Sequence, residues 1–336
     1  MLVLAIESSC DETSVSIVDM TETKRIILSN EIASQIPIHQ KFGGVVPEIA
    51  GRAHIEAIAG LCDAALKNAG VSQKDISLCA VTNRPGLIGA LLVGVNFAKS
   101  FAYANNIPLV AVNHIRGHIA ANYLAYEDLK PPFLALVVSG GHTSLVDVRD
   151  FCDMESIGAT RDDAAGEAFD KAARVMGLPY PGGAEMDRLA KSGNKDAIKF
   201  PKVSLKDSYD FSFSGLKTAF MSYINTCQMK NEPFSKEDLA ASFTNAVISE
   251  IEDKLTLAVK NIPCDKIVLA GGVSANSHLR AKVSEIGEKY HKKVYIPPLS
   301  LCGDNGAMIA AAGYFEYLAK NTADLSLNAY AAHGIY

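Results

Sequence analysis

The feature that most constrains the fold is an arrangement that occurs twice along the chain. Residues 2–19 read as an apolar strand, a polar turn and a second strand, and residues 133–148 repeat that order around the turn 139–142. Thr143-Ser144 stands 130 residues after Thr13-Ser14. Later in each half, an apolar strand leads through glycines into a helix. Single strand–turn–helix units recur by chance in any α/β protein, but the shared order favours a duplication, so we expect an α/β protein with two similar halves.

The joint between the halves is marked by two prolines, Pro131 and Pro132, which stop a helix and stiffen a connection. We therefore expect one domain at 1–130 and a second at 131–336. Residues 158–261 look largely helical and form an insertion in the second domain, with 237–259 as the clearest amphipathic run. We expect the last helix, which begins near residue 305, to rejoin the first domain.

Composition excludes several classes of protein. With 49% apolar and 21% charged residues, the 336-residue chain is neither disordered nor built to span a membrane, and its first residues lack the basic and apolar regions of a signal peptide. The seven cysteines are widely spaced, with no Cys-x-x-Cys pair, which argues against disulfides and thiolate metal sites and indicates a reducing cytoplasm. The net charge of −5 means that a nucleic acid would need a local basic patch.

Two glycine-containing turns are candidate nucleotide sites. The turn Ser139-Gly140-Gly141 lies between two strands, where backbone N–H groups can face an anion, although a plain hairpin turn explains it equally well. Residues 271–276 follow a second apolar strand and open a helix. Neither matches the Rossmann or P-loop spacing. We expect a nucleotide to lie between the two halves.

A possible metal site is indicated by His114 and His118, which are four residues apart and so share one face of a helix. Two unrelated histidines are the alternative. A zinc protease would need Glu directly after the first His, where this chain has Ile115. Asp304, just before the last helix, could supply a third ligand, or it could simply cap that helix.

Two further segments look like parts of a ligand pocket or a charged surface. Residues 162–171 are expected to form an acidic helix, followed by a glycine- and proline-rich loop at 177–183. Residues 188–206 carry six cations against one carboxylate, with Lys195, Lys199 and Lys202 at their centre. A solvated loop is the plainer explanation, and a contact with RNA is the functional one.

Eight motifs together make a specific resemblance that covers the whole chain in order. They lie at 6–13, 113–118, 138–143, 162–171, 177–183, 211–218, 271–276 and 303–305. In combination they resemble the tRNA adenosine threonylcarbamoyltransferase family, formerly called O-sialoglycoprotein endopeptidase. The resemblance implies an actin-like, Hsp70-like (ASKHA) fold of two duplicated RNase H-like domains. It also implies transfer of a threonylcarbamoyl group from threonylcarbamoyl-AMP to N6 of adenosine 37 in tRNAs that read codons beginning with A.

The resemblance also implies particular site residues. It makes His114, His118 and Asp304 the ligands of one divalent ion, Fe²⁺ first and Zn²⁺ second. It assigns the adenylate substrate to Val137, Val138, Ser139, Gly140, Gly141, Asp170, Gly183, Asp187 and Asn276. Many relatives have Glu where this chain has Arg116, which puts the surroundings of the metal in doubt, and many bacterial ones have Pro where it has Ala184.

The remaining expectations concern the base and the partners. Asp11 or Glu12, in the first turn, could take the proton of the attacking amine. Bacterial relatives imply dependence on a smaller paralogue of the same fold and on an ATPase partner. An ATP-binding chaperone or kinase of the same fold is the main alternative, but those proteins lack the paired histidines. A metalloprotease is disfavoured.

Overall fold

The computed structural model describes residues 1–202, 205 and 208–332. It divides into two compact units. The first unit contains Met1–Pro131, Val148–Glu155 and the described residues from Pro297 onward, and the second contains Pro132–Asp147 and Ser156–Ile296. The C-terminal helix therefore belongs to the same unit as the N-terminal strands.

The first unit is built on a five-stranded sheet with the order β3-β2-β1-β4-β5. Its strands are β1 (Leu2–Glu7), β2 (Glu12–Met20), β3 (Arg25–Ser34), β4 (Leu78–Arg84) and β5 (Leu109–Asn113). The first three strands pair antiparallel, whereas β4 pairs parallel with both β1 and β5. Every residue of β1 after Leu2 is buried, as expected for a strand covered on both faces.

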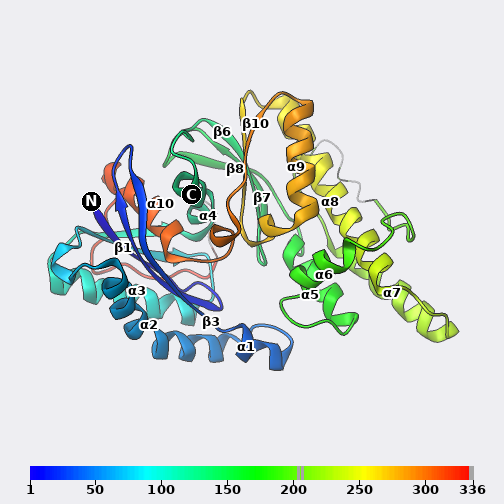
Figure 1. Ribbon diagram of the computed structural model, residues 1–336, viewed down its shortest axis with the longest axis horizontal. Coiled ribbons are helices and arrows are strands. Elements are labelled where there is room, and N and C mark those ends of the chain that lie inside the picture. The colour runs from blue at the N-terminus through cyan, green and yellow to red at the C-terminus, as the bar shows by residue number, and fades with distance from the viewer. Residues whose placement is uncertain (203–204, 206–207, 333–336) are drawn as a thin grey trace. The chain divides into compact units, whose positions relative to one another are not determined.

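Helices cover both faces of this sheet (Figure 1). The covering helices are α2 (Pro47–Ala69), α3 (Ile88–Asn105), α4 (His114–Ala125) and α10 (Gly306–Leu318). The unit also contains the short helix α1 (Ile36–His39) and the 3₁₀ turns η1 (Gln40–Phe42), η2 (Gln73–Asp75) and η4 (Leu299–Leu301). Leu4 and Ile6 pack into the core beneath α2 and α3. Ala5 and Ala80 face α10 instead, because two glycines of α10 approach them closely. The alternation of side chains along the strands thus supplies two cores.

The second unit repeats this sheet. Its strand order is β10-β9-β6-β7-β8, so β6, β7, β8, β9 and β10 occupy the places of β1, β2, β3, β4 and β5. The strands are β6 (Phe133–Val138), β7 (Thr143–Val148), β8 (Met154–Ala159), β9 (Lys266–Ala270) and β10 (Lys293–Tyr295). As in the first unit, the central pair formed by β6 and β9 is parallel.

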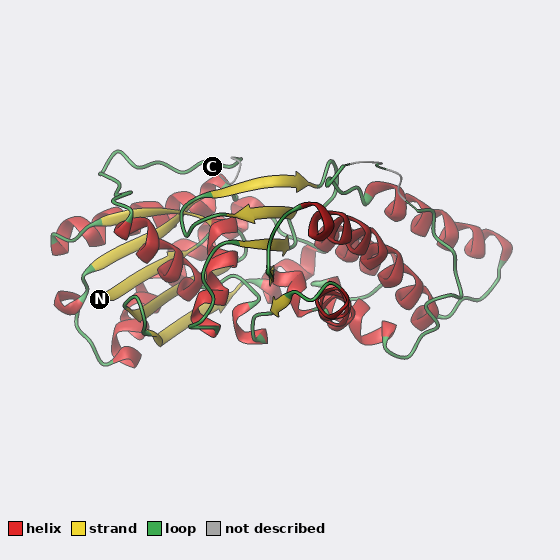
Figure 2. Ribbon diagram, turned by 90° about the horizontal axis from the view of Figure 1, so that it is seen from above, coloured by secondary structure: helices red, strands yellow, loops and turns green. Residues whose placement is uncertain are grey.

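The helices of the second unit lie mostly between β8 and β9 in sequence. Figure 2 draws the helices in red and the strands in yellow. The helices of this unit are α5 (Ala165–Val175), α6 (Gly182–Ala190), α7 (Ser214–Lys230), α8 (Lys236–Asn261) and α9 (Ser277–Lys289), with the 3₁₀ turn η3 (Gly272–Ala275). Phe169, Phe220 and Phe243 pack together in their core. The first four helices lie within the expected helical insertion.

Two expected helix starts were wrong. The acidic segment is helical only from Ala165, because Asp162 and Asp163 bind other groups instead of continuing a helix. The helix expected to open within residues 271–276 begins at Ser277, after a 3₁₀ turn. No helix in the described part of the chain is long and apolar enough to cross a bilayer, and none of the seven cysteines, all of which the structure describes, forms a disulfide.

Candidate metal centre and substrate site

The two histidines lie in the first turns of α4, which follows β5 without a loop. Asn113 caps this helix, since its side-chain oxygen accepts a hydrogen bond from the backbone N–H of Ile115 at 2.8 Å. His114 and His118 are almost completely buried. Gly117 lets α4 lie close to α10, because a Cβ there would come within 2.7 Å of the Ile309 side chain. The close packing of these two helices brings the segment before α10 to the histidines.

Asp304 stands in that segment, two residues before α10 begins. Asn305 caps the helix by accepting a hydrogen bond from the backbone N–H of Met308 at 3.0 Å. The alternative that Asp304 serves as the helix cap is therefore wrong, and its carboxylate is directed to the histidines instead.

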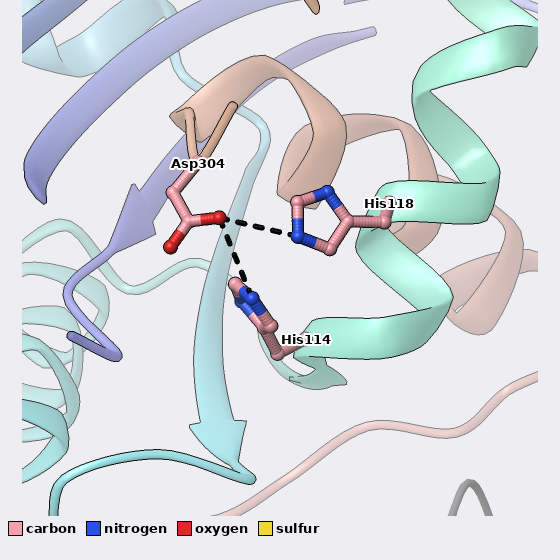
Figure 3. Close-up of side chains that lie close together, drawn as sticks. All are labelled: His114, His118 and Asp304. Carbon is pink, nitrogen blue, oxygen red and sulfur yellow. Dashed lines mark ion pairs between the residues drawn. The ribbon is translucent and has the colours of Figure 1, made fainter. Parts of the chain in front are cut away.

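The three side chains converge on one point (Figure 3). Asp304 Oδ1 lies 3.1 Å from His118 Nε2 and 3.5 Å from His114 Nε2. One ligand atom from each residue lies within 4.8 Å of the other two. Neither ring nitrogen of His118 has a hydrogen-bond partner among the described residues, although both are buried. A buried imidazole without a hydrogen bond, facing a carboxylate and a second imidazole, fits a three-ligand metal site with open positions.

Glu7, at the end of β1, binds Nδ1 of His114, the ring nitrogen that does not face Asp304. It was not assigned a role from the sequence. Its Oε2 lies 3.0 Å from His114 Nδ1 and accepts a hydrogen bond from the Thr82 hydroxyl at 2.6 Å. With its Nδ1–H donated to Glu7, the neutral ring of His114 would present the lone pair of Nε2 to a metal. The only sequence signal was a carboxylate ending an otherwise apolar strand.

The charges around this site favour a cation. Burial alone would raise the pKa of Glu7, but the charge of His114 and the hydrogen bond with it outweigh burial and lower that pKa. Burial would likewise lower the pKa of His114, yet the Asp304 and Glu7 carboxylates raise it to about 9. Glu12 has its pKa raised to about 10, first by burial and then by Asp304 and Asp11. Several carboxyl groups thus share one buried region, and a bound cation would relieve their mutual repulsion.

Arg116, the residue that departs from the pattern of many relatives, pairs with a carboxylate of α10. Its Nη1 lies 2.6 Å from Glu316 Oε1 on α10. The residue that departs from the family pattern therefore forms an ion pair between two helices, and the three candidate ligands keep their geometry.

In the second unit, the glycine turns meet at the ends of β6 and β9. Gly271 has φ +91°, and a Cβ on it would overlap the carbonyl oxygen of Val138. A Cβ on Gly166, at the start of α5, would overlap the carbonyl oxygen of Ser139. These close approaches gather the β6–β7 turn, the N-terminus of α5 and the turn after β9 into one place.

The polar candidates for the substrate site hold helix ends together. Asp170 accepts hydrogen bonds from the backbone N–H groups of Gly182 at 2.7 Å and Gly183 at 3.3 Å, which fixes the start of α6. Asp187 accepts from the backbone N–H of Ser277 at 3.0 Å and from its hydroxyl at 2.8 Å.

The hydrogen bonds to Ser277 bring α6 and α9 together. Asn276 caps α9 through the backbone N–H of Leu279 at 3.0 Å. Because Ser277 directly follows Asn276, the contact of Asp187 also brings these two candidates side by side. The resulting network runs from α5 through α6 to α9.

The motif at 211–218 has a structural partner in the acidic segment. Asp162 accepts hydrogen bonds from the backbone N–H of Phe213 at 2.8 Å and from the Ser214 hydroxyl at 2.7 Å. Burial would raise the pKa of Asp162, but the hydrogen bonds from residues 212–214 lower it. Asp163 forms ion pairs with Lys171 and Lys217. These contacts fix the start of α7 against the segment before α5.

Solved structures with low sequence identity share the fold. HypF from T. kodakarensis matches with a TM-score of 0.64 and 13% identity over 97% of this chain and 48% of that one. Component A of (R)-2-hydroxyglutaryl-CoA dehydratase from Acidaminococcus fermentans matches with a TM-score of 0.56 and 14% identity over 95% and 98% of the two chains. The actin-like fold expected from the sequence is confirmed.

Sequence comparisons identify much nearer relatives. The tRNA N6-adenosine threonylcarbamoyltransferase of Clostridium perfringens is 55% identical over 329 residues, which are 98% of this chain and 96% of that protein. The protein of that name from Clostridioides difficile is 54% identical over 330 residues, 98% and 97% of the two chains. The family model for TsaD, tRNA N6-adenosine threonylcarbamoyltransferase, matches residues 26–311. With a two-histidine, one-aspartate cluster in place and relatives aligned along nearly its whole length, the chain belongs to the tRNA N6-adenosine threonylcarbamoyltransferase family.

Proposed function

We propose that this protein transfers the threonylcarbamoyl group of threonylcarbamoyl-AMP to N6 of adenosine 37 in tRNAs that read codons beginning with A. The observation that carries the proposal is the cluster of the buried His114 and His118 with the half-buried Asp304 in a chain of this family. In the reaction, the adenosine amino group attacks the carbamoyl carbon, the bond from that carbon to the phosphate oxygen breaks, and AMP leaves.

The metal ligands would be the Nε2 atoms of both histidines and a carboxylate oxygen of Asp304. Nitrogen and oxygen donors of this kind suit a first-row transition ion, and we expect Fe²⁺, with Zn²⁺ as the alternative. When bound, the ion would polarise substrate oxygens and offset the charge that develops on the departing phosphate. Glu7 keeps His114 in the orientation that this binding requires.

The adenylate would be held in the second unit. The backbone N–H groups of the exposed turn Gly140-Gly141 are available to its phosphate, and no atom lies within 4 Å of a Cβ built on either glycine. Asp170, Asp187 and Asn276 would hold the nucleoside, together with Val137, Val138, Ser139 and Gly183. Positioning of threonylcarbamoyl-AMP, whose carbamoyl and phosphate groups form a mixed anhydride, would then supply much of the rate enhancement.

The attacking amine must lose a proton, and Asp11 or Glu12 would accept it. The raised pKa of Glu12, about 10, which burial and neighbouring carboxylates produce, describes the site without its cation. A bound cation favours ionised carboxylates and would return such a group to the form that accepts a proton.

We further propose that the protein works in the cytoplasm with a smaller paralogue of the same fold and an ATPase partner. The family name implies tRNA as the substrate. The partners rest on the resemblance of the motifs to those of bacterial relatives.

The decisive experiment incubates the purified protein with threonylcarbamoyl-AMP and unmodified tRNA, with and without these partners, followed by nucleoside mass spectrometry. Threonylcarbamoyladenosine is expected with the wild type, and Asp304→Asn should abolish it together with bound metal. Asp324→Asn, in the exposed segment after α10, is the matched control and should leave both unchanged. The proposal fails if the complete mixture yields no modified nucleoside.

The adenylate site is tested separately by calorimetric titration with AMP. Asp170→Asn is preferable to alanine because it keeps an acceptor for the backbone N–H groups of Gly182 and Gly183. Asp170→Asn and Asn276→Ala should each weaken AMP binding at least fivefold, about 1 kcal/mol or the usual value of one hydrogen bond. Unchanged affinity in both variants would rule out this site.

A further inference from the structure

A cavity in the second unit lies apart from every residue proposed above to bind metal or adenylate. Its volume is about 330 Å³, within the range of small-molecule sites. Part of its wall comes from α8 and the start of α7, and part from residues 195–202. This segment is the middle of the basic stretch noted in the sequence, of which Lys206 lies outside the described residues.

Glu250 of α8 gives this cavity a buried acceptor. The residue is only 3% exposed, and its Oε1 has no hydrogen-bond partner among the described residues. The Nζ of the neighbouring Lys254 donates to the carbonyl oxygens of Leu205 and Ser208, and no hydrogen bond joins it to Oε1 of Glu250. An unpaired buried acceptor of this kind costs about 1–3 kcal/mol, so a ligand that donates an N–H would be favoured there.

The rest of the lining combines apolar side chains, the lysines of residues 195–202 with Asp196, and the polar residues Ser242, Asn245 and Ser249 of α8. Phe200 and Leu216 contribute apolar surface. Lys195, Lys199 and Lys202 line the same cavity with exposed side chains, and only Lys202 has an ion-pair partner among the described residues, Asp253 at 2.6 Å. A ligand that fits all three features has a flat apolar body, N–H donors on its edge and an anionic group outside.

We propose that this cavity binds one unpaired guanosine nucleotide of the tRNA substrate, with the base inside against Glu250 and the flanking phosphates on Lys195 and Lys199. The proposal rests on the proposed function, which supplies the RNA. Guanine presents two adjacent N–H donor groups, N1–H and N2–H₂, to a carboxylate. Uracil has one N–H between two carbonyl oxygens, which a carboxylate repels. Stacking on an apolar wall and phosphate contacts from lysines are the usual means of binding single-stranded RNA.

The test measures binding of two labelled heptamers, oligouridylate and the same RNA with one central guanosine, to the full-length protein at pH 8. Burial raises the pKa of Glu250 to about 7, so its carboxyl group is ionised at that pH. Neither contains adenine, so the adenylate site does not contribute. The wild type should bind the guanosine RNA at least fivefold more tightly, and Glu250→Gln should remove this preference while leaving the affinity for oligouridylate unchanged. Glu252→Gln, on the same helix but outside the cavity, is the matched control. An equal affinity of the wild type for both RNAs, or an unchanged preference in Glu250→Gln, overturns the proposal.

A second variant keeps the test decisive if Glu250→Gln does not fold. Lys195→Gln with Lys199→Gln changes only exposed side chains and should weaken both RNAs equally. It should also reduce the slope of log affinity against log salt by about 1.4, the value for two phosphates of single-stranded RNA. An unchanged slope overturns the proposal.

A failure of the proposed function can be distinguished from a failure of the guanosine site. In the transfer assay with tRNA and the partners, Glu250→Gln should raise KM for tRNA and leave kcat unchanged. If the wild type forms no threonylcarbamoyladenosine, the proposed function fails, whereas the guanosine preference of the heptamers still reports on the cavity.

Discussion

Replacing Glu7 by glutamine should weaken metal binding although Glu7 is not itself a proposed ligand. Its carboxylate receives donors on both oxygens: the backbone N–H of Ser9 on Oε1, and the Thr82 hydroxyl and His114 Nδ1 on Oε2. A glutamine side chain has only one oxygen. In either orientation its NH₂ group therefore faces a donor, and either His114 or Ser9 loses its acceptor.

The magnitude follows from these contacts. Glu7 is fully buried, so the mismatched amide should lower the free energy of unfolding by about 1–3 kcal/mol. Loss of the partner that orients a metal-binding histidine typically lowers metal affinity about 10–100-fold. His114→Ala removes a ligand outright and should lose more.

The assay is titration of the metal-free protein with Fe²⁺ or Zn²⁺ against a chelator, with elemental analysis of the purified variants and a melting curve for each. Glu316→Gln is the control, because Glu316 is a carboxylate of α10 that pairs with Arg116 and not with a candidate ligand. If Glu7→Gln melts lower but binds metal as tightly as the wild type, Glu7 has a purely structural role and the reasoning is refuted.

Three further predictions concern the second unit. Gly271→Ala should destabilise the protein by about 3 kcal/mol in a denaturant titration, because of its positive φ and a clash with a backbone carbonyl of β6, while Gly272→Ala, with free space around it, should cost less than 1 kcal/mol. Asp162→Ala should cost about 1–3 kcal/mol, since the backbone and hydroxyl donors of 212–214 lose their acceptor; an unchanged melting temperature would contradict this. Burial raises the pKa of Glu250 to about 7 in the folded protein, from 4.5 in the unfolded chain. Between these two pH values the folded protein holds a proton that the unfolded chain has lost. The free energy of unfolding should therefore fall by about 3 kcal/mol as the pH rises from 4.5 to above 7. Glu250→Gln should flatten this dependence in melting curves recorded between pH 4.5 and 8.

The sequence was sufficient for what depends on local pattern. The spacing of His114 and His118 predicts a shared helical face, and the repeated strand–turn–strand order predicts two similar sheets. The role of Glu7 could not be predicted, because it depends on a hydrogen bond with His114, 107 residues away. The start of α5 was missed for a similar reason, since Asp162 binds residues some 50 positions later. Where a side chain's partner is remote, periodicity and propensity contain no signal of it.

The two copies of the duplicated unit have diverged at the same turn. Between β1 and β2 the turn contains Asp11 and is bounded by Glu7 and Glu12. After burial, the carboxylates of Asp304, Asp11 and Glu7 help to raise the pKa of Glu12, and Glu7 helps to raise that of the buried His114. Between β6 and β7 the equivalent turn is Ser139 to His142, whose two glycines have no side chains to block their N–H groups. The first turn suits a cation and the second an anion. The acidic turn would therefore favour a metal ion that His114, His118 and Asp304 hold, without supplying its ligands, whereas the glycine turn could itself bind a phosphate.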